Sequence, residues 1–133
     1  YQRLVDAAGG FKTEPEKIIN GGPMMGQAMF DLDTPVVKNS SALTCLTKDE
    51  VAANAETACI RCGKCVSVCP SHIVPQMMMD AAERNNLTLF EGLNGMECME
   101  CGSCTFICPA KRPLTQAFKE MRKAVAASRR KKA

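Results

Sequence analysis

Residues 59–70 read CIRCGKCVSVCP, and residues 98–109 read CMECGSCTFICP. The second run repeats the first at a displacement of 39 residues, with every cysteine and the closing Cys-Pro in register. In each run, three cysteines spaced three residues apart let one tight loop present three thiolates to the same site. The fourth cysteine lies just before a proline. This spacing is typical of the ligands of two 4Fe–4S clusters, in which the fourth cysteine of each run binds the cluster of the other run.

We therefore predict two clusters, each held by three cysteines of one run and the last cysteine of the other. The ligands of cluster 1 are Cys59, Cys62, Cys65 and Cys108, and those of cluster 2 are Cys98, Cys101, Cys104 and Cys69. No catalytic residue is predicted. The single histidine, His72, has no acidic neighbour in sequence and is interpreted as a surface residue. No nicotinamide or flavin fingerprint is present.

Other interpretations of the cysteines remain open at this point. Repeated CxxC pairs also suit tetrahedral zinc, so the alternative from another class is a zinc-stabilised interaction module without redox function. Zinc motifs rarely place four cysteines in so compact a run. A disulfide framework fits less well, because nine cysteines is an odd number. The ninth, Cys45, lies outside both runs and is expected to be a small buried apolar residue.

The pattern of apolar residues and turn signals divides the chain into three segments. Residues 1–45 are predicted to be the end of a β-containing domain, with a helix at 2–8 and strands at 17–20 and 35–38. Residues 46–127 are predicted to form the two-cluster domain. Residues 128–133 are basic and are expected to be a disordered tail.

Three helices are predicted in the two-cluster domain, which makes the expected fold class mainly α. A capping box at Thr47 and Glu50 predicts a helix to about Glu56. A second helix is expected over residues 75–85, between the cysteine runs, with one face formed by Met77, Met78, Ala81 and Ala82. A third begins after Pro113, with an apolar face formed by Leu114, Ala117, Phe118, Met121 and Val125.

The formal net charge of +3 is unevenly distributed, because residues 110–133 hold nine basic side chains and one acidic side chain. The negative charge of thiolate-bound clusters offsets this excess, so nucleic acid is not the expected partner. Oxygen-sensitive clusters favour a reducing, cytoplasmic compartment. No apolar run approaches the roughly 18 residues that span a bilayer. Arg61 and Lys64 in the first run, against Glu97 and Glu100 beside the second, predict the lower reduction potential for cluster 2.

Segments beside the cysteines carry a resemblance to a known family. These segments are IINGGPMMG at 18–26, DTPVVK at 33–38 and ACIRCGKC at 58–65. Together they resemble the C subunits of the Rnf (Rsx) electron transport complexes over nearly all of residues 1–127. The resemblance implies a helical ferredoxin-like domain with two 4Fe–4S clusters, preceded at residues 1–45 by the remnant of a soluble ligand-binding β-grasp domain.

The resemblance also implies a function. Rnf complexes couple electron flow between ferredoxin and NAD⁺ to Na⁺ or H⁺ transport, so the chain is expected to be an electron-relaying part of a translocase. It would lie peripherally on the cytoplasmic face of the cell membrane and contact the membrane-embedded and ferredoxin-like subunits. FMN and NAD(H) are expected only on a preceding domain that this chain lacks. A related flavoprotein, the cobalamin reductase of bacterial microcompartments, shares these motifs and is the runner-up.

Overall fold

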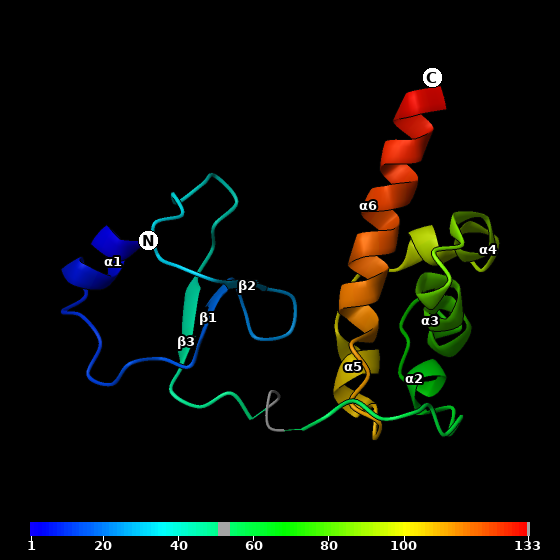
Figure 1. Cartoon of the computed structure of the whole chain (residues 1–133), viewed down its shortest axis with the longest axis horizontal. Helices are drawn as coiled ribbons and strands as arrows, with labels where there is room; N and C mark the ends of the chain where they lie inside the picture. Colours follow the sequence, from blue (N-terminus) through cyan, green and yellow to red (C-terminus); the bar gives the residue numbers. More distant parts are fainter. Residues whose placement is uncertain (51–53, 133) are drawn as a thin grey trace. The chain divides into compact units, whose positions relative to one another are not determined.

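The computed structural model describes residues 1–50 and 54–132, and the chain divides into two compact units, residues 1–54 and 55–133 (Figure 1). The described residues form six α-helices, one 3₁₀-helix and a three-stranded sheet. Helices dominate the second unit, whereas the first unit contains the sheet. The fold is therefore mixed, and the predicted mainly α class describes only the second unit.

The first unit begins with helix α1 (Gln2–Ala7), followed by strands β1 (Lys17–Asn20), β2 (Gln27–Met29) and β3 (Leu43–Leu46). The strands are antiparallel in the order β2-β1-β3. A tight turn joins β1 to β2, and the Gly26 N–H donates to the Gly22 carbonyl at 2.8 Å. A Cβ on Gly26 would lie 2.4 Å from that oxygen, so this close approach requires glycine.

The predictions for helix 2–8 and strand 17–20 are confirmed, but the strand predicted at residues 35–38 is wrong. There the Ser40 N–H donates to the Val37 carbonyl at 2.9 Å, and the Ser40 hydroxyl accepts from the Val37 N–H at 3.1 Å. This local turn takes the backbone groups that a strand would need for pairing. The two strands that pair with β1 are instead β2 and β3, and the sequence interpretation missed both.

Cys45 is exposed, which contradicts the expectation of a buried residue. It lies on β3 directly opposite Ile18, whereas the buried Ile19 of β1 lies opposite Thr44. Because neighbouring residues of a strand point to opposite faces of a sheet, Cys45 lies on the face away from Ile19.

The helix predicted from Thr47 to about Glu56 falls partly on residues 51–53, which lie outside the described residues. The described residues on both sides, 47–50 and 54–56, are not helical. The Asp49 N–H donates to a Glu16 carboxylate oxygen at 2.7 Å, and the Asp49 carboxylate forms an ion pair with Lys17 at 2.7 Å. These contacts tie the start of the predicted helix to the first unit.

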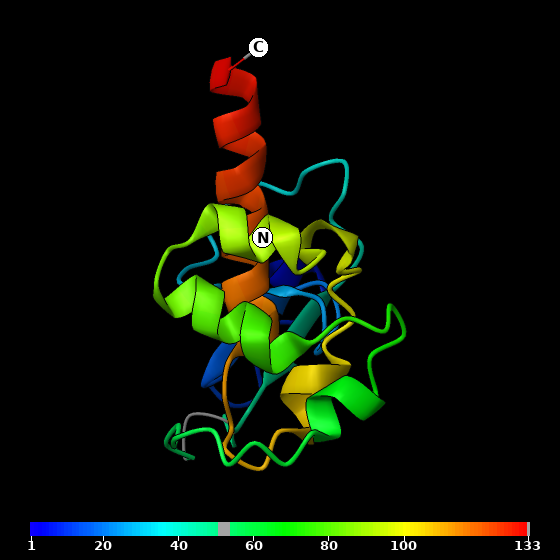
Figure 2. The ribbon, with the colours of Figure 1, turned by 90° about the vertical axis from the view of Figure 1, so that its right-hand side faces the viewer.

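The second unit comprises α2 (Lys64–Ser67), α3 (Pro75–Glu83), α4 (Leu87–Gly92), the 3₁₀-helix η1 (Gly95–Glu97), α5 (Ser103–Ile107) and α6 (Leu114–Lys132). Helices α3 and α4 pack against the long helix α6, and the short helices α2 and α5 lie side by side (Figure 2). No helix in the described part of the chain is both long enough and apolar enough to cross a bilayer.

The core of the second unit lies between α3, α4 and α6. The rings of Phe90 and Phe118 are fully buried with their centroids 6.1 Å apart. The predicted apolar face of α6 is confirmed, with Leu114, Phe118, Met121 and Val125 buried and Ala117 packed against this core. On α3 the prediction is correct for Met78 and Ala81, but Met79 is buried in place of Met77, which is 47% exposed.

Residues 128–132 continue helix α6, so the expected disordered tail differs from the structure at these positions. Ala, Arg and Lys are strong helix formers, and extending an existing helix costs far less than starting one. Arg129 also forms an ion pair with Glu91 of α4 at 2.7 Å. Residue 133 lies outside the described residues.

Candidate metal centres

Eight of the nine cysteines line two pockets in the second unit. Pocket 1 has about 410 Å³ of free space including its open mouth, and its cysteines are Cys59, Cys62, Cys65 and Cys108. Pocket 2 has about 330 Å³ on the same measure, and its cysteines are Cys69, Cys98, Cys101 and Cys104. Each pocket therefore receives three cysteines from one run and the last cysteine of the other run.

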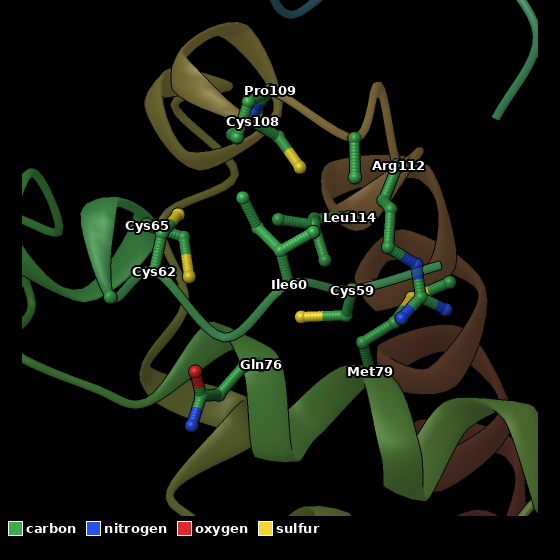
Figure 3. Close-up of a pocket in the computed structure, with 12 residues that line it drawn as sticks. Cys59, Ile60, Cys62, Cys65, Gln76, Met79, Cys108, Pro109, Arg112 and Leu114 are labelled. Carbon is green, nitrogen blue, oxygen red and sulfur yellow. The ribbon is translucent and has the colours of Figure 1, made fainter. Parts of the chain in front are cut away.

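Figure 3 shows how the chain brings the cysteines of pocket 1 together. Cys59 and Cys62 lie on the loop that leads into α2, and Cys108 lies on the far side of the pocket beside Pro109. The sulfur atoms of Cys59 and Cys108 point into the space between these segments. The Thr57 N–H donates to the Ala110 carbonyl at 3.0 Å, which fastens the segment before the first run to the segment after the second.

All nine cysteines belong to the described part of the chain, and all are free thiols. Within residues 1–50 and 54–132, no three His, Cys, Asp or Glu side chains converge on a point that would hold a single metal ion. The donors of each pocket are four sulfur atoms. Sulfur ligands suit iron–sulfur clusters and soft metal ions, so the donor set fits a 4Fe–4S cluster in each pocket.

The backbone conformation, like the cysteines, repeats at a displacement of 39 residues. Gly63 and Gly102, which precede α2 and α5, both have left-handed backbones with φ of 75° and 84°. The non-glycine residues Arg61 and Glu100, also 39 apart, have φ of 54° and 58°. A Cβ on Gly63 would meet no atom within 4 Å, so glycine here supplies the left-handed conformation rather than room for a neighbouring protein group.

The walls of the two pockets also correspond across this displacement. Helix α3 contributes Gln76 and Met79 to pocket 1, and α6 contributes Thr115 and Phe118 to pocket 2 at the equivalent positions. Helices α3 and α6 are thus counterparts. The sequence interpretation stopped at the cysteines and missed these wall residues, although extending the same displacement past each Cys-Pro would have found them.

The two pockets differ in charge. The wall of pocket 1 includes Arg112, whereas the equivalent position of pocket 2 is Ile73. Glu100 lines pocket 2, but its counterpart Arg61 does not line pocket 1, and neither does Lys64. The two cations that the sequence placed around cluster 1 are therefore absent from the wall of its pocket, and Arg112 is present there instead.

Arg112 is a buried guanidinium, with 8% of its surface exposed. Its Nε donates to Glu56 at 3.1 Å, and its Nη2 donates to Glu83 at the end of α3. Burial by itself would lower the pKa of Arg112, but the hydrogen bond to Glu56 and the charges of Glu83 and Glu56 raise it. The side chain therefore carries its positive charge, on the same side of pocket 1 as Cys59 and Met79 (Figure 3).

At pocket 2, hydroxyl groups approach one of the sulfur atoms. The Thr115 Oγ1 lies 3.8 Å from the Cys104 Sγ and 2.9 Å from the Thr105 Oγ1, and the Thr115 N–H donates to the Thr105 Oγ1 at 2.9 Å. The equivalent positions at pocket 1 are Gln76 and Val66, so only pocket 2 has this pair of hydroxyls.

Burial changes the acidity of several of these thiols. It raises the pKa of Cys104, against the opposing effect of the Thr115 hydroxyl, and it raises the pKa of Cys65 and Cys98. The Ser103 hydroxyl, 3.4 Å from the Cys101 Sγ, lowers the pKa of Cys101. Because metals and clusters bind the thiolate form, loading these pockets releases protons from the buried thiols.

Known proteins resemble this chain in the same region. Residues 58–112 match the family of 4Fe-4S dicluster domains. Across 131 residues, 98% of its length, the chain is 47% identical to the C subunit of the Na(+)-translocating ferredoxin:NAD(+) oxidoreductase complex of Acetobacterium woodii. It is also 50% identical over 78 residues, 59% of its length, to the C subunit of the proton-translocating ferredoxin:NAD(+) oxidoreductase complex of Clostridium ljungdahlii.

The matches cover only part of each relative. The chain spans 30% of the Acetobacterium protein and 17% of the Clostridium protein. A third relative, the C subunit of the ion-translocating oxidoreductase complex of Methanosarcina acetivorans, is 42% identical over 72 residues, 54% of the chain and 16% of the relative. The resemblance to the C subunits of Rnf complexes is thereby confirmed: the chain is homologous to part of these proteins and contains a 4Fe-4S dicluster domain.

Proposed function

We propose that this chain relays single electrons through two 4Fe–4S clusters, as part of the C subunit of an ion-translocating ferredoxin:NAD⁺ oxidoreductase. The observation that carries the proposal is the partition of eight cysteines into two pockets, each completed by the last cysteine of the other run. A 4Fe–4S cluster accepts or gives up one electron at a time, at a potential set by its surroundings. The ligands are those assigned from the spacing, Cys59, Cys62, Cys65 and Cys108 in pocket 1, and Cys98, Cys101, Cys104 and Cys69 in pocket 2.

The protein's own residues hold the clusters and control access to them. Apolar side chains from α3 and α6 exclude water, namely Met79 and Leu114 at pocket 1 and Pro75 and Phe118 at pocket 2. The left-handed glycines precede α2 and α5. Within the same runs, the backbone N–H groups of Val66 and Ser103 hydrogen-bond to the sulfur atoms of Cys65 and Cys101. These features support rigid, shielded electron carriers that change little on reduction.

The homology supports a proposal for the setting of the relay. Residues 1–45 would be the end of a β-grasp domain, and residues 46–127 the two-cluster domain. FMN and NAD(H) would bind elsewhere in the whole protein. The chain would sit peripherally on the cytoplasmic face of the membrane, held there by the other subunits of the complex. The coupling ion differs between the Acetobacterium and Clostridium relatives by name.

Chemical analysis of anaerobically purified protein tests the relay. We expect about eight iron and eight acid-labile sulfide per chain, with absorbance near 400 nm that dithionite bleaches. A colourless protein that contains stoichiometric zinc in place of iron would instead establish the zinc-stabilised interaction module. Co-purification with membrane subunits separates the Rnf assignment from a cobalamin reductase, which would purify without them.

A further inference from the structure

The equivalence of the two pockets isolates the positions at which they differ. Most wall residues are related by the 39-residue displacement and are of similar character, such as Ile60 and Met99 or Met79 and Phe118. The difference in charge is concentrated in two side chains. Pocket 1 has the cation of Arg112 where pocket 2 has Ile73, and pocket 2 has the anion of Glu100.

The guanidinium of Arg112 is much less exposed to water than the two carboxylates that pair with it. Its partners Glu56 and Glu83 do not line pocket 1, and their side chains are 46% and 50% exposed, against 9% for Arg112. Water screens exposed charges more strongly than buried ones. The two carboxylates therefore offset the buried cation only in part, and they hold the guanidinium in place.

At pocket 2 an anion and a cation are paired. Glu100 lines the pocket and forms an ion pair with Arg122 of α6. The Arg122 charge lowers the pKa of Cys98, and the opposing effect of the Glu100 charge is smaller, so pocket 2 has no dominant anion among the described residues. An electron added to a cluster with four thiolates increases its negative charge from about −2 to −3. A nearby cation stabilises the reduced form and a nearby anion destabilises it, because the interaction energy varies inversely with distance.

We propose that Arg112 raises the reduction potential of the cluster in pocket 1 above that of the cluster in pocket 2, so that an electron entering the relay rests in pocket 1. This inference rests on the proposed two-cluster relay and adds the residue that orders its two sites. The Thr115 hydroxyl beside Cys104 acts in the other direction by favouring the reduced cluster in pocket 2. A neutral hydroxyl dipole is a weaker source of field than a full buried charge, so the order set by Arg112 holds.

A redox titration of the whole chain, followed by electron paramagnetic resonance, tests the proposal. In Arg112→Gln, we expect the ratio of reduced to oxidised cluster in pocket 1 to fall about tenfold at fixed potential, a downward shift of about 59 mV for a one-electron couple. Arg112→Lys, which keeps the charge, should restore most of the wild-type potential. Arg129→Gln removes an α6 arginine that lines neither pocket and should leave both potentials unchanged.

The converse variant is Glu83→Gln, which keeps Arg112 and removes one of its carboxylates. We expect a smaller upward shift of the same signal. If Arg112→Gln assembles only one cluster, Glu83→Gln decides: a rise supports the role of Arg112, and an unchanged potential overturns it. Equal potentials in wild type and Arg112→Gln, with both clusters present, would overturn the inference and leave the relay intact. Absence of iron and sulfide from the wild type would instead refute the relay itself.

Discussion

The Thr115 Oγ1 lies 3.8 Å from the Cys104 Sγ, close enough for the hydroxyl to donate to a thiolate. Thr115 is 7% exposed, and its own oxygen lies 2.9 Å from that of Thr105. When the Thr105 hydroxyl donates to Thr115, the Thr115 hydroxyl is left to donate to sulfur. Pocket 2 thus has a side-chain hydroxyl donor from α6, whereas the equivalent Gln76 of α3 acts on Cys65 through its backbone N–H.

Thr115→Val should therefore lower the reduction potential of the cluster in pocket 2 and leave that in pocket 1 unchanged. Hydrogen bonds to sulfur stabilise the more negative, reduced cluster, so losing one favours the oxidised form. We expect a smaller shift than for Arg112→Gln, measured by the same redox titration. Thr88→Val, at an exposed position of α4 away from both pockets, is the control. A shift confined to pocket 1 would contradict the assignment of Thr115.

Substituting the last cysteine of each run, one at a time, should reveal which run completes which pocket. Cys108→Ser should disturb the cluster held by Cys59, Cys62 and Cys65, and Cys69→Ser the other cluster. Each variant should lose up to about half of the iron and sulfide or show one altered resonance signal. The exposed Cys45, changed to serine, should retain the full content. If Cys108→Ser altered the signal that Thr115→Val shifts, the crossed arrangement would be refuted.

Removing the iron with a chelator under anaerobic conditions should loosen α2 and α5 before the rest of the second unit. Neither helix has a buried residue of its own, and each has at most five residues. Helices this short are not stable alone, so the bound clusters would supply most of their order. Helices α3, α4 and α6 share an apolar core and should persist longer. Amide hydrogen exchange measures this difference, and uniform loss of protection would contradict it.

Phe90→Ala should destabilise the second unit by about 3–5 kcal/mol, because a fully buried aromatic side chain leaves a cavity when removed. Phe90 packs against Phe118, and a Cβ on Gly95 would lie 2.3 Å from the Phe90 ring, so the site is tightly filled. Denaturation in urea followed by circular dichroism measures the change. Phe30→Ala is the matched control, since Phe30 is fully exposed and its loss should change stability by less than about 0.5 kcal/mol.

The spacing of apolar residues in the sequence predicted which face of a helix is buried where that spacing repeats over several turns. The face of α6 could be predicted because Leu114, Phe118, Met121 and Val125 recur at helical spacing over several turns. The predicted face of α3 contained Met77 in place of Met79. The side chains of Met77, Met78 and Met79 are chemically identical, and only packing against α4 and α6 selects Met79 for burial. The prediction of a strand at residues 35–38 was wrong because Ser40 forms a turn with Val37, and β propensity alone does not predict such a turn.

The order of residues along the chain was enough to predict the sulfur donors, their spacing and the 39-residue duplication, because all three are properties of a linear string. Which charged groups face each pocket depended on the folded chain. Arg112 lies after the second run yet lines the pocket of the first, since the crossing of Cys108 carries the following residues to the opposite site. Charge acts through space, so the presence of Arg112 at pocket 1 could not be predicted from its position in the sequence.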